Sequence, residues 1–281
     1  MVGYARPTKL SEALAALDRA TATVIAGGTD VYPAHVGRAV PGDLLDISAV
    51  AELRGIADRG DHWRVGALAT WTDLSRAPLP ALFDGLKCAA SAIGGIQIQN
   101  AGTLCGNLCN ASPAADGIPA MMSLDGRVEL SSVGGIETLP VGQFVTGNRR
   151  TARRPNQLMT AILIPKPAAP RAYGAFTKLG ARASLVISIV MVAAVIEVSL
   201  AGVVVAARVA VGACSPLACR LPALEAALVG EPLTSALGGI AQDSHLGPLA
   251  PIDDARASAA YRRDAALTVI RRTLESLAAN P

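Results

Sequence analysis

Apolar positions near the start of the chain follow two periods, one helical and one strand-like. Leu10, Leu14 and Leu17 recur at helical spacing within "TKLSEALAALDRA", and Thr8 is placed to cap the start of this helix. The run at 23–26 is strand-like instead, because its apolar residues are continuous and rich in β-branched side chains. The pattern therefore predicts a helix followed directly by a strand.

This first strand ends abruptly at two adjacent glycines, Gly27 and Gly28, followed by Thr29 and Asp30. Two further strands are predicted over 43–48 and 62–70, so the first sixty-odd residues predict a β–α–β-type lobe. Glycines free the backbone to turn sharply and bring its N–H groups close to a ligand. Ligands in α/β layers commonly bind at such strand ends.

The middle of the chain alternates patterned segments with one polar stretch. Residues 82–95 read as a helix that stops at Gly94-Gly95, and 156–167 as a strand closed by prolines. Between them, "IQNAGTLCGNLCNASPAAD" (98–116) contains almost no large apolar side chain. We interpret it as a loop that wraps a polar ligand. A short helix and the strand "RVELSS" are predicted to follow it.

The most apolar stretch, 185–211, resembles a membrane segment in hydropathy alone. Glu197 interrupts it, Ala201-Gly202 supplies a turn, and β-branched residues dominate it. These features predict two buried strands joined as a hairpin rather than a membrane helix. The pattern of apolar and polar residues changes beyond Arg171, which predicts a domain boundary near 170. A final helix is predicted from Leu267, Ile270 and Leu274, which recur at helical spacing.

Composition narrows the class of protein. Of 281 residues, 51% are apolar and only 3% aromatic, so a sizeable core must be built from Ala, Val, Leu and Ile. A net charge of +3 is too small to indicate nucleic-acid binding. The five cysteines form no CxxC pair, which disfavours a metal or iron–sulfur site and predicts reduced thiols in a cytoplasmic protein.

Two polar segments carry the candidate chemistry. The turn "AGGTD" supplies consecutive backbone N–H groups that suit a diphosphate, although a purely structural turn is the commoner reading of such a sequence. In the second segment Thr103, Asn107, Ser112 and Asp116 are short hydrogen-bonding side chains, and Asp116 suits ribose or ribityl hydroxyls. An elaborate turn held by local hydrogen bonds is the alternative there.

The segments "AGGTD", "GTLCGNLCNASPAAD", "LPVGQFVTGNRRT", "ILIP", "KLGARASLVIS" and "PIDDARASAAYRRDAALTVIRR" together resemble the FAD-binding (medium) subunit of the molybdenum hydroxylase family. This family includes the medium subunits of aerobic carbon monoxide dehydrogenase and the flavin domain of xanthine dehydrogenase. The resemblance implies an α+β chain with a two-lobed vanillyl-alcohol-oxidase-like (PCMH-type) FAD-binding fold over 1–170, its lobes at about 1–57 and 58–170. A C-terminal α+β domain of the carbon monoxide dehydrogenase flavoprotein type, 171–281, would cover the flavin.

The resemblance also implies where FAD binds. The glycine turn would cradle the diphosphate, the second segment would hold the rest of the cofactor, Leu158 and Met159 would line apolar surroundings, and residues around 184–188 would approach the isoalloxazine ring. The implied cofactor-binding residues are Val24, Ile25, Ala26, Gly27, Gly28, Thr29, Asp30, Val31, Ile93, Thr103, Gly106, Asn107, Asn110, Asp116, Leu158, Met159 and Ser188. No residue is assigned a catalytic role, because His35, His62 and His245 are scattered without a triad partner.

Three positions depart from the family pattern. Cys105 replaces a common glycine and would be strained if its backbone needed a positive φ. Gln99 stands where an arginine is common, which removes a cationic donor. Ile93 stands where some xanthine dehydrogenases stack an aromatic ring on the flavin.

By this resemblance, the chain would take electrons from [2Fe–2S] clusters in a small subunit, while a large subunit holds the molybdenum cofactor. It would pass them to an external acceptor, within a heterotrimer or a dimer of heterotrimers. "GNRRTARRP" crowds four arginines at 149–154; a solvated loop is the simplest reading, and part of a docking face is the functional one. The alternatives are a self-contained FAD-dependent oxidoreductase of the same fold and a non-catalytic scaffold without FAD.

Overall fold

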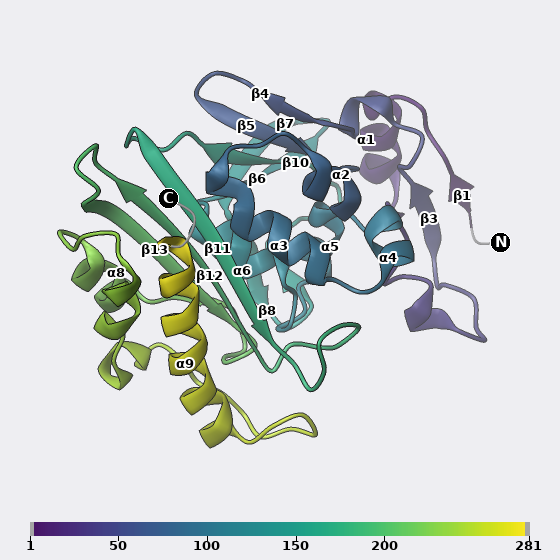
Figure 1. The fold of residues 1–281 in the computed structure, drawn as a ribbon. Coiled ribbons are helices and arrows are strands. Elements are labelled where there is room, and N and C mark those ends of the chain that lie inside the picture. Colours follow the sequence, from purple (N-terminus) through teal and green to yellow (C-terminus); the bar gives the residue numbers. More distant parts are fainter. Residues whose placement is uncertain (1–2, 279–281) are drawn as a thin grey trace.

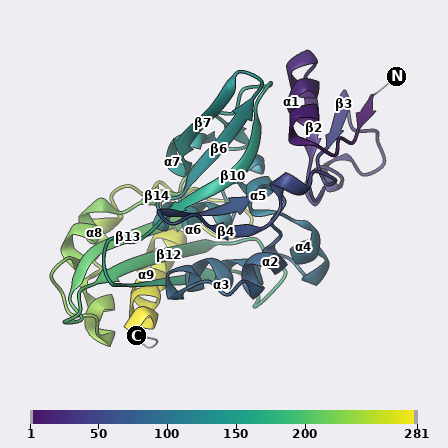
Figure 2. The same ribbon diagram turned by 90° about the horizontal axis from the view of Figure 1, so that it is seen from above.

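The computed structural model describes residues 3–278, which form three main sheets with helices packed against them (Figure 1). The first sheet is parallel, with strand order β1-β3-β2. Its elements are β1 (Tyr4–Ala5), α1 (Leu10–Arg19), β2 (Ala22–Ile25) and β3 (Asp43–Asp46). Figure 2 shows this small lobe at one side of the molecule. The predicted helix, the strand before the glycine turn and the next strand are confirmed.

Two details of this lobe differ from the prediction. Helix α1 begins at Leu10, and the N–H groups of Thr8 and Lys9 both donate to the Glu12 carboxylate, so Thr8 is not the cap. The strand predicted over 62–70 is shorter and lies in the second sheet rather than in this lobe. It pairs with the short strand at 56–58 on one side and with the strand near 160 on the other, and local sequence does not reveal this second, long-range pairing.

The second sheet is antiparallel, with order β4-β5-β10-β6-β7. Its strands are β4 (Ile56–Asp58), β5 (His62–Gly66), β6 (Arg127–Ser132), β7 (Gly135–Pro140) and β10 (Leu158–Pro165). The helices of this part of the chain are α2 (Trp71–Arg76), α3 (Asp84–Ala92), α4 (Ile96–Ala101), α5 (Leu104–Asn110), α6 (Gly117–Ser123) and α7 (Val141–Phe144). A small hairpin, β8 (Val145–Gly147) and β9 (Arg150–Thr151), precedes β10.

The interpretation of 98–116 as a loop is wrong for most of its length, because α4 and α5 occupy it. The Thr103 hydroxyl caps α5 by accepting the N–H of Gly106 at 3.0 Å. Leu104 and Leu108, one helical turn apart, are both fully buried. A cap and two leucines are therefore enough to form a short helix in an otherwise polar segment.

The third sheet is antiparallel, with order β11-β12-β13-β14, and both of its faces pack against helices. Its strands are β11 (Arg171–Leu179), β12 (Val190–Val198), β13 (Val204–Gly212) and β14 (Cys219–Arg220), and its own helices are α8 (Pro222–Leu228) and α9 (Ala259–Ala278). Helix α9 lies across β11 and β12, while α3 and α6, from the earlier part of the chain, also pack on this sheet (Figure 1).

Alternate residues of β12 belong to two different cores, which explains its unbroken apolar sequence. Ala193 and Val195 join the core of the first part of the chain, whereas Val192 and Ala194 join the core beneath α9. All nine residues of β12 are buried. The predicted hairpin over 185–211 is thus confirmed. No helix within residues 3–278 has the length and apolar character needed to cross a membrane.

Candidate functional site

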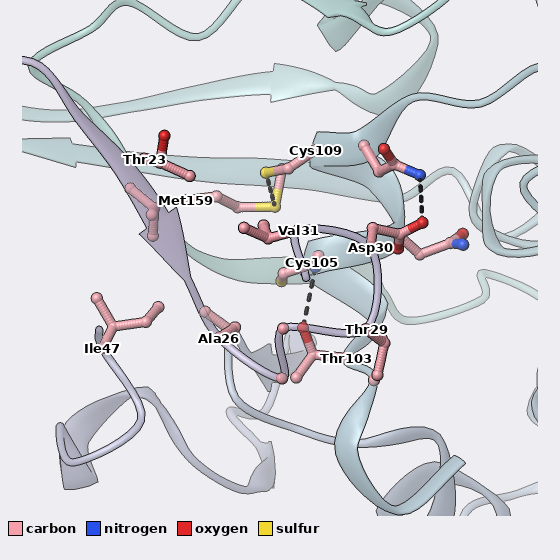
Figure 3. Close-up of a pocket in the computed structure, with 18 of the residues that line it drawn as sticks. Thr23, Ala26, Thr29, Asp30, Val31, Ile47, Thr103, Cys105, Cys109 and Met159 are labelled. Atoms are coloured by element: carbon pink, nitrogen blue, oxygen red, sulfur yellow. Dashed lines mark hydrogen bonds between the residues drawn. The ribbon is translucent and has the colours of Figure 1, made fainter. Parts of the chain in front are cut away.

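A cavity of about 490 Å³ lies between the glycine turn after β2, helix α5, strand β10 and the β8–β9 hairpin (Figure 3). This volume falls within the range typical of ligand sites. Most of the residues implied by the sequence line it: Val24, Ala26, Gly27, Gly28, Thr29, Asp30, Val31, Ile93, Thr103, Gly106, Asn107, Asn110, Leu158 and Met159. The fold therefore brings together two segments some eighty residues apart.

The glycine turn presents backbone donors along the cavity wall. Within residues 3–278, the N–H groups of 27–31 donate no hydrogen bond, whereas the carbonyls of Gly28 and Val31 accept from Tyr32 and His35. The turn is thus fixed through its carbonyls while its amides stay available. Consecutive free N–H groups of this kind form a binding site for anions.

Each glycine of the turn is required for a different steric reason. A Cβ on Gly27 would lie 1.8 Å from the carbonyl oxygen of Ala101, so the turn touches the backbone where α4 ends. Gly28 has a φ of +69°, and a Cβ there would also meet the ring of Tyr32 at 2.5 Å. The glycines therefore allow both the sharp turn and the close approach of the two lobes.

Helix α5 forms the opposite wall. Asn107 accepts the N–H of Gly117 through Oδ1 at 3.1 Å, which ties α5 to the start of α6. Cys105 lies inside the helix and has no positive φ, so the strain considered for this position does not arise. Gln99, on α4, donates to the carbonyls of Ser91 and Ile93 and so holds the end of α3 in place of any ligand contact.

Sulfur-containing and branched side chains make another part of the lining apolar. Cys109 Sγ and Met159 Sδ are 4.0 Å apart, and Ile47, Ile93 and Ile98 also face the cavity. The apolar surroundings raise the pKa of the Cys109 thiol to about 11, against a smaller opposing effect of Arg153. The thiol is therefore neutral near pH 7.

The β8–β9 hairpin adds positive charge that the sequence interpretation did not assign to the site. Arg149 and Arg153 both line the cavity. Arg149 Nη1 donates to Asn110 Oδ1 at 2.8 Å, and Asn110 Nδ2 donates to Asp30 Oδ1 at 2.9 Å. The arginine run was the signal in the sequence, but only the fold shows which of its members reach the cavity.

Three implied residues do not line the cavity. Ile25 is a buried core residue of β2. Asp116 is buried and accepts from Lys178 Nζ at 2.6 Å and from Ser188 Oγ at 2.7 Å. Desolvation raises the pKa of Asp116, and Lys178 partly offsets this. Asp116 thus joins the start of α6 to Lys178 on β11 and to Ser188, beside the cavity rather than in it.

The cavity thus combines free amides and two guanidinium groups with an apolar wall. Such a lining fits a ligand that carries phosphate groups at one part and planar apolar rings at another. The three histidines lie elsewhere: His35 bonds the Val31 carbonyl, His62 pairs with Asp61, and His245 accepts the N–H of Gln242. Across residues 3–278, no group of three or more His, Cys, Asp or Glu side chains is arranged to hold a metal ion.

Comparison with known proteins agrees with this chemistry. Residues 1–167 match the FAD binding domain in molybdopterin dehydrogenase, and residues 175–277 match the CO dehydrogenase flavoprotein C-terminal domain. The chain is 36% identical over 216 residues to the nicotinate dehydrogenase FAD-subunit of Eubacterium barkeri, covering 75% of this chain and 73% of the relative. It is 28% identical to the carbon monoxide dehydrogenase medium chain of Hydrogenophaga pseudoflava, covering 97% and 96%. Reconstituted CO dehydrogenase from Oligotropha carboxidovorans superposes with a TM-score of 0.90 at 27% identity, covering 100% of this chain and 99% of the other.

Proposed function

This chain belongs to the family of FAD-binding subunits of molybdopterin dehydrogenases, and we propose that it is the electron outlet of its complex. It is an FAD-binding medium subunit of the molybdenum hydroxylase type. In the proposed role it accepts electrons from [2Fe–2S] clusters of a small subunit and delivers them to an external acceptor. The molybdenum cofactor belongs to a large subunit.

The observation that carries the proposal is the amide-lined and arginine-lined cavity within the matched FAD-binding domain. The free N–H groups of 27–31 would meet the diphosphate, with Arg149 and Arg153 supplying positive charge. Ile93, Leu158 and Met159 would contact apolar ring surfaces, and Thr103, Gly106, Asn107 and Asn110 would complete the polar wall. Ile25, Asp116 and Ser188 would act indirectly, by fixing the elements that surround the cofactor.

FAD supplies one-electron and two-electron redox chemistry when it is bound. The chain's own part is to bind, orient and shield it. The titratable side chains of the lining are Asp30, the two arginines and the cysteines Cys105 and Cys109, whose thiols have pKa values raised by burial. The guanidinium groups cannot accept a proton, the two thiols hold theirs, and the Asp30 carboxylate accepts a hydrogen bond from Asn110. This lining favours an electron-transfer subunit over a self-contained oxidoreductase.

We also propose the assembly and division of labour that accompany this role. Residues 1–170 would form the FAD-binding domain, with lobes at about 1–57 and 58–170, and residues 171–281 would cover the flavin. The partners would be a molybdenum-cofactor large subunit and a [2Fe–2S] small subunit, in a cytoplasmic heterotrimer or a dimer of heterotrimers. Support comes from relatives described as medium chains or FAD-subunits, of which this chain spans nearly the full length in several cases.

The test is to purify the tagged full chain from its own host cells and to measure FAD, iron and molybdenum together. We expect FAD in the chain, with iron and molybdenum carried by two co-purifying subunits. A chain that purifies alone and reduces an acceptor with a substrate of its own would contradict the proposed role and support the self-contained flavoenzyme.

A further inference from the structure

Arg149 occupies an unusual backbone conformation at the cavity wall. It follows Asn148 in the turn between β8 and β9 and has a φ of +53°, a region that disfavours side chains other than Gly, Asn and Asp. Its N–H donates to the carbonyl of Ala111 at 2.8 Å, just beyond the end of α5. A strained residue held by its surroundings is a reason to look for a role in binding.

The side chain of Arg149 is joined to the glycine turn through one amide. Asn110 accepts from Arg149 through Oδ1 at 2.8 Å and donates to Asp30 through Nδ2 at 2.9 Å. The relay links three elements at the cavity: the glycine turn, the last residue of α5 and the hairpin (Figure 3 shows Asp30 and its partner amide). Within residues 3–278, the other guanidinium nitrogens of Arg149 donate no hydrogen bond and so remain available to a ligand.

This relay resolves an electrostatic conflict. The carboxylate of Asp30 stands beside the free amides of 27–31, where it would repel a phosphate group. Asn110 holds that carboxylate on one side and presents Arg149 on the other. The cation therefore offsets the carboxylate and adds a donor of the geometry that phosphate oxygens prefer.

We propose that Arg149 is the residue that makes the cavity selective for a ligand with a diphosphate group, and that Asn110 is its positioning residue. This inference rests on the proposed function, since it assigns one part of the FAD site. It also divides the arginine run between two faces. Arg149 and Arg153 line the cavity, whereas Arg154 pairs with Glu137 outside it. Arg149 and Arg150 are both exposed, but Arg150 is not part of the lining.

The experiment uses the full chain freed of bound nucleotide, titrated separately with FAD, ADP and riboflavin. ADP carries the diphosphate without a flavin, and riboflavin carries the flavin without phosphate. Arg149→Gln is compared with Arg150→Gln, which removes the same charge from the neighbouring position. We expect Arg149→Gln to weaken FAD and ADP roughly 10-fold to 100-fold, as for loss of a charge-assisted hydrogen bond. Riboflavin binding should change less than about twofold, and Arg150→Gln should change all three less than about threefold, as for an exposed charge.

Two further variants distinguish the loss of a contact between Arg149 and the ligand from a loss of folding. Arg149→Gly removes the cation but relieves the positive φ, so it should lose affinity for FAD and ADP while its melting temperature stays unchanged or rises. Asn110→Ala should weaken FAD binding by a smaller factor, roughly 3-fold to 10-fold, because the cation remains but is no longer held. Added salt should weaken FAD binding less in Arg149→Gln than in the unmodified chain.

The outcomes distinguish this inference from the proposed function. If the unmodified chain binds FAD and ADP but Arg149→Gln binds both equally well, Arg149 makes no contact with the diphosphate and the inference is overturned. Equal losses for riboflavin and ADP would also overturn it, because they would indicate a general collapse of the cavity. If the unmodified chain binds neither FAD nor ADP, the proposed function itself fails.

Discussion

Replacing Gly27 by alanine tests how the two lobes meet at the cavity. The added Cβ would lie 1.8 Å from the Ala101 carbonyl oxygen and 2.5 Å from its carbon, and 3.1 Å from the Gly102 nitrogen. All three are backbone atoms, so no side chain can rotate out of the way. The glycine turn and the end of α4 must move apart, which opens the cavity between them.

The expected cost follows from overpacking, about 1–3 kcal/mol for inserting a methyl group into a packed site. For a chain of this size 1 kcal/mol corresponds to a shift of about 2–4 °C, so the melting temperature should fall by roughly 2–12 °C. The matched control is Gly247→Ala, because Gly247 has helical φ and ψ and a Cβ there meets nothing within 4 Å. The control should be neutral or stabilising by up to about 1 kcal/mol.

The assay combines thermal unfolding of both variants with the ratio of bound FAD to protein. Gly27→Ala should melt lower and retain less FAD, while Gly247→Ala should match the unmodified chain in both. If Gly27→Ala melts and binds FAD like the unmodified chain, the close contact between the turn and α4 does not exist in solution, and the reasoning is refuted.

Three other perturbations test parts of the structure away from this contact. Arg208 Nη2 pairs with Glu197 Oε1 at 2.7 Å, and Glu197 is buried. Arg208→Met should destabilise the chain by about 3–5 kcal/mol in a denaturant titration, because it leaves this buried carboxylate without its cation. Arg154→Met, which breaks the exposed pair with Glu137, should cost less than about 1 kcal/mol, and equal costs would contradict the burial of the Arg208–Glu197 pair. Lys178→Met should cost a similar 3–5 kcal/mol near pH 7 by leaving Asp116 unpaired. Desolvation raises the pKa of Asp116, so the folded state binds that proton more tightly than the unfolded state. Protonation of Asp116 therefore stabilises the fold below the ordinary pKa of aspartate, and this contribution is lost as pH rises through the raised pKa. Removing Lys178 takes away the charge that partly offsets the rise, so the cost of the buried carboxylate is largest at high pH. The penalty of Lys178→Met should therefore shrink as pH is lowered, and a penalty independent of pH would argue against a charged Asp116. Finally, Cys105 is buried, and burial raises the pKa of its thiol, so it should react with a thiol reagent at pH 8 at least about 10-fold more slowly than the exposed Cys109, judged by peptide mapping; equal rates would show that Cys105 is not buried.

Local sequence predicts well those helices and strands in which the spacing of apolar residues matches the side chains that are buried. Helix α1 and the hairpin of β12 and β13 follow directly from apolar periodicity, because each buries a face or a whole strand against neighbours. Composition predicts a loop over 98–116, but most of the segment is helical because a single cap and two buried leucines outweigh its polar composition. The placement of β5 depended on pairing with β10 about one hundred residues later, which no local pattern encodes.

The candidate site also has parts that local sequence predicts and parts that it does not. The glycine turn and α5 were found because their short motifs carry the amides and polar side chains that line the cavity. The sequence predicts a solvated or docking loop at Arg149, because it shows a run of charges but not the turn that directs this arginine toward the cavity. Asp116 is predicted to contact the ligand, yet its partners Lys178 and Ser188 lie 62 and 72 residues further along the chain, beyond the reach of motif reasoning.

The most direct test of the account is the FAD content of the full chain, measured by visible absorption after saturation with FAD and removal of the unbound cofactor. The account predicts flavin bands equivalent to one FAD per chain. A chain that retains no flavin after this treatment would contradict it, because the free amides of the glycine turn and the arginines of the hairpin would then serve some other ligand or none.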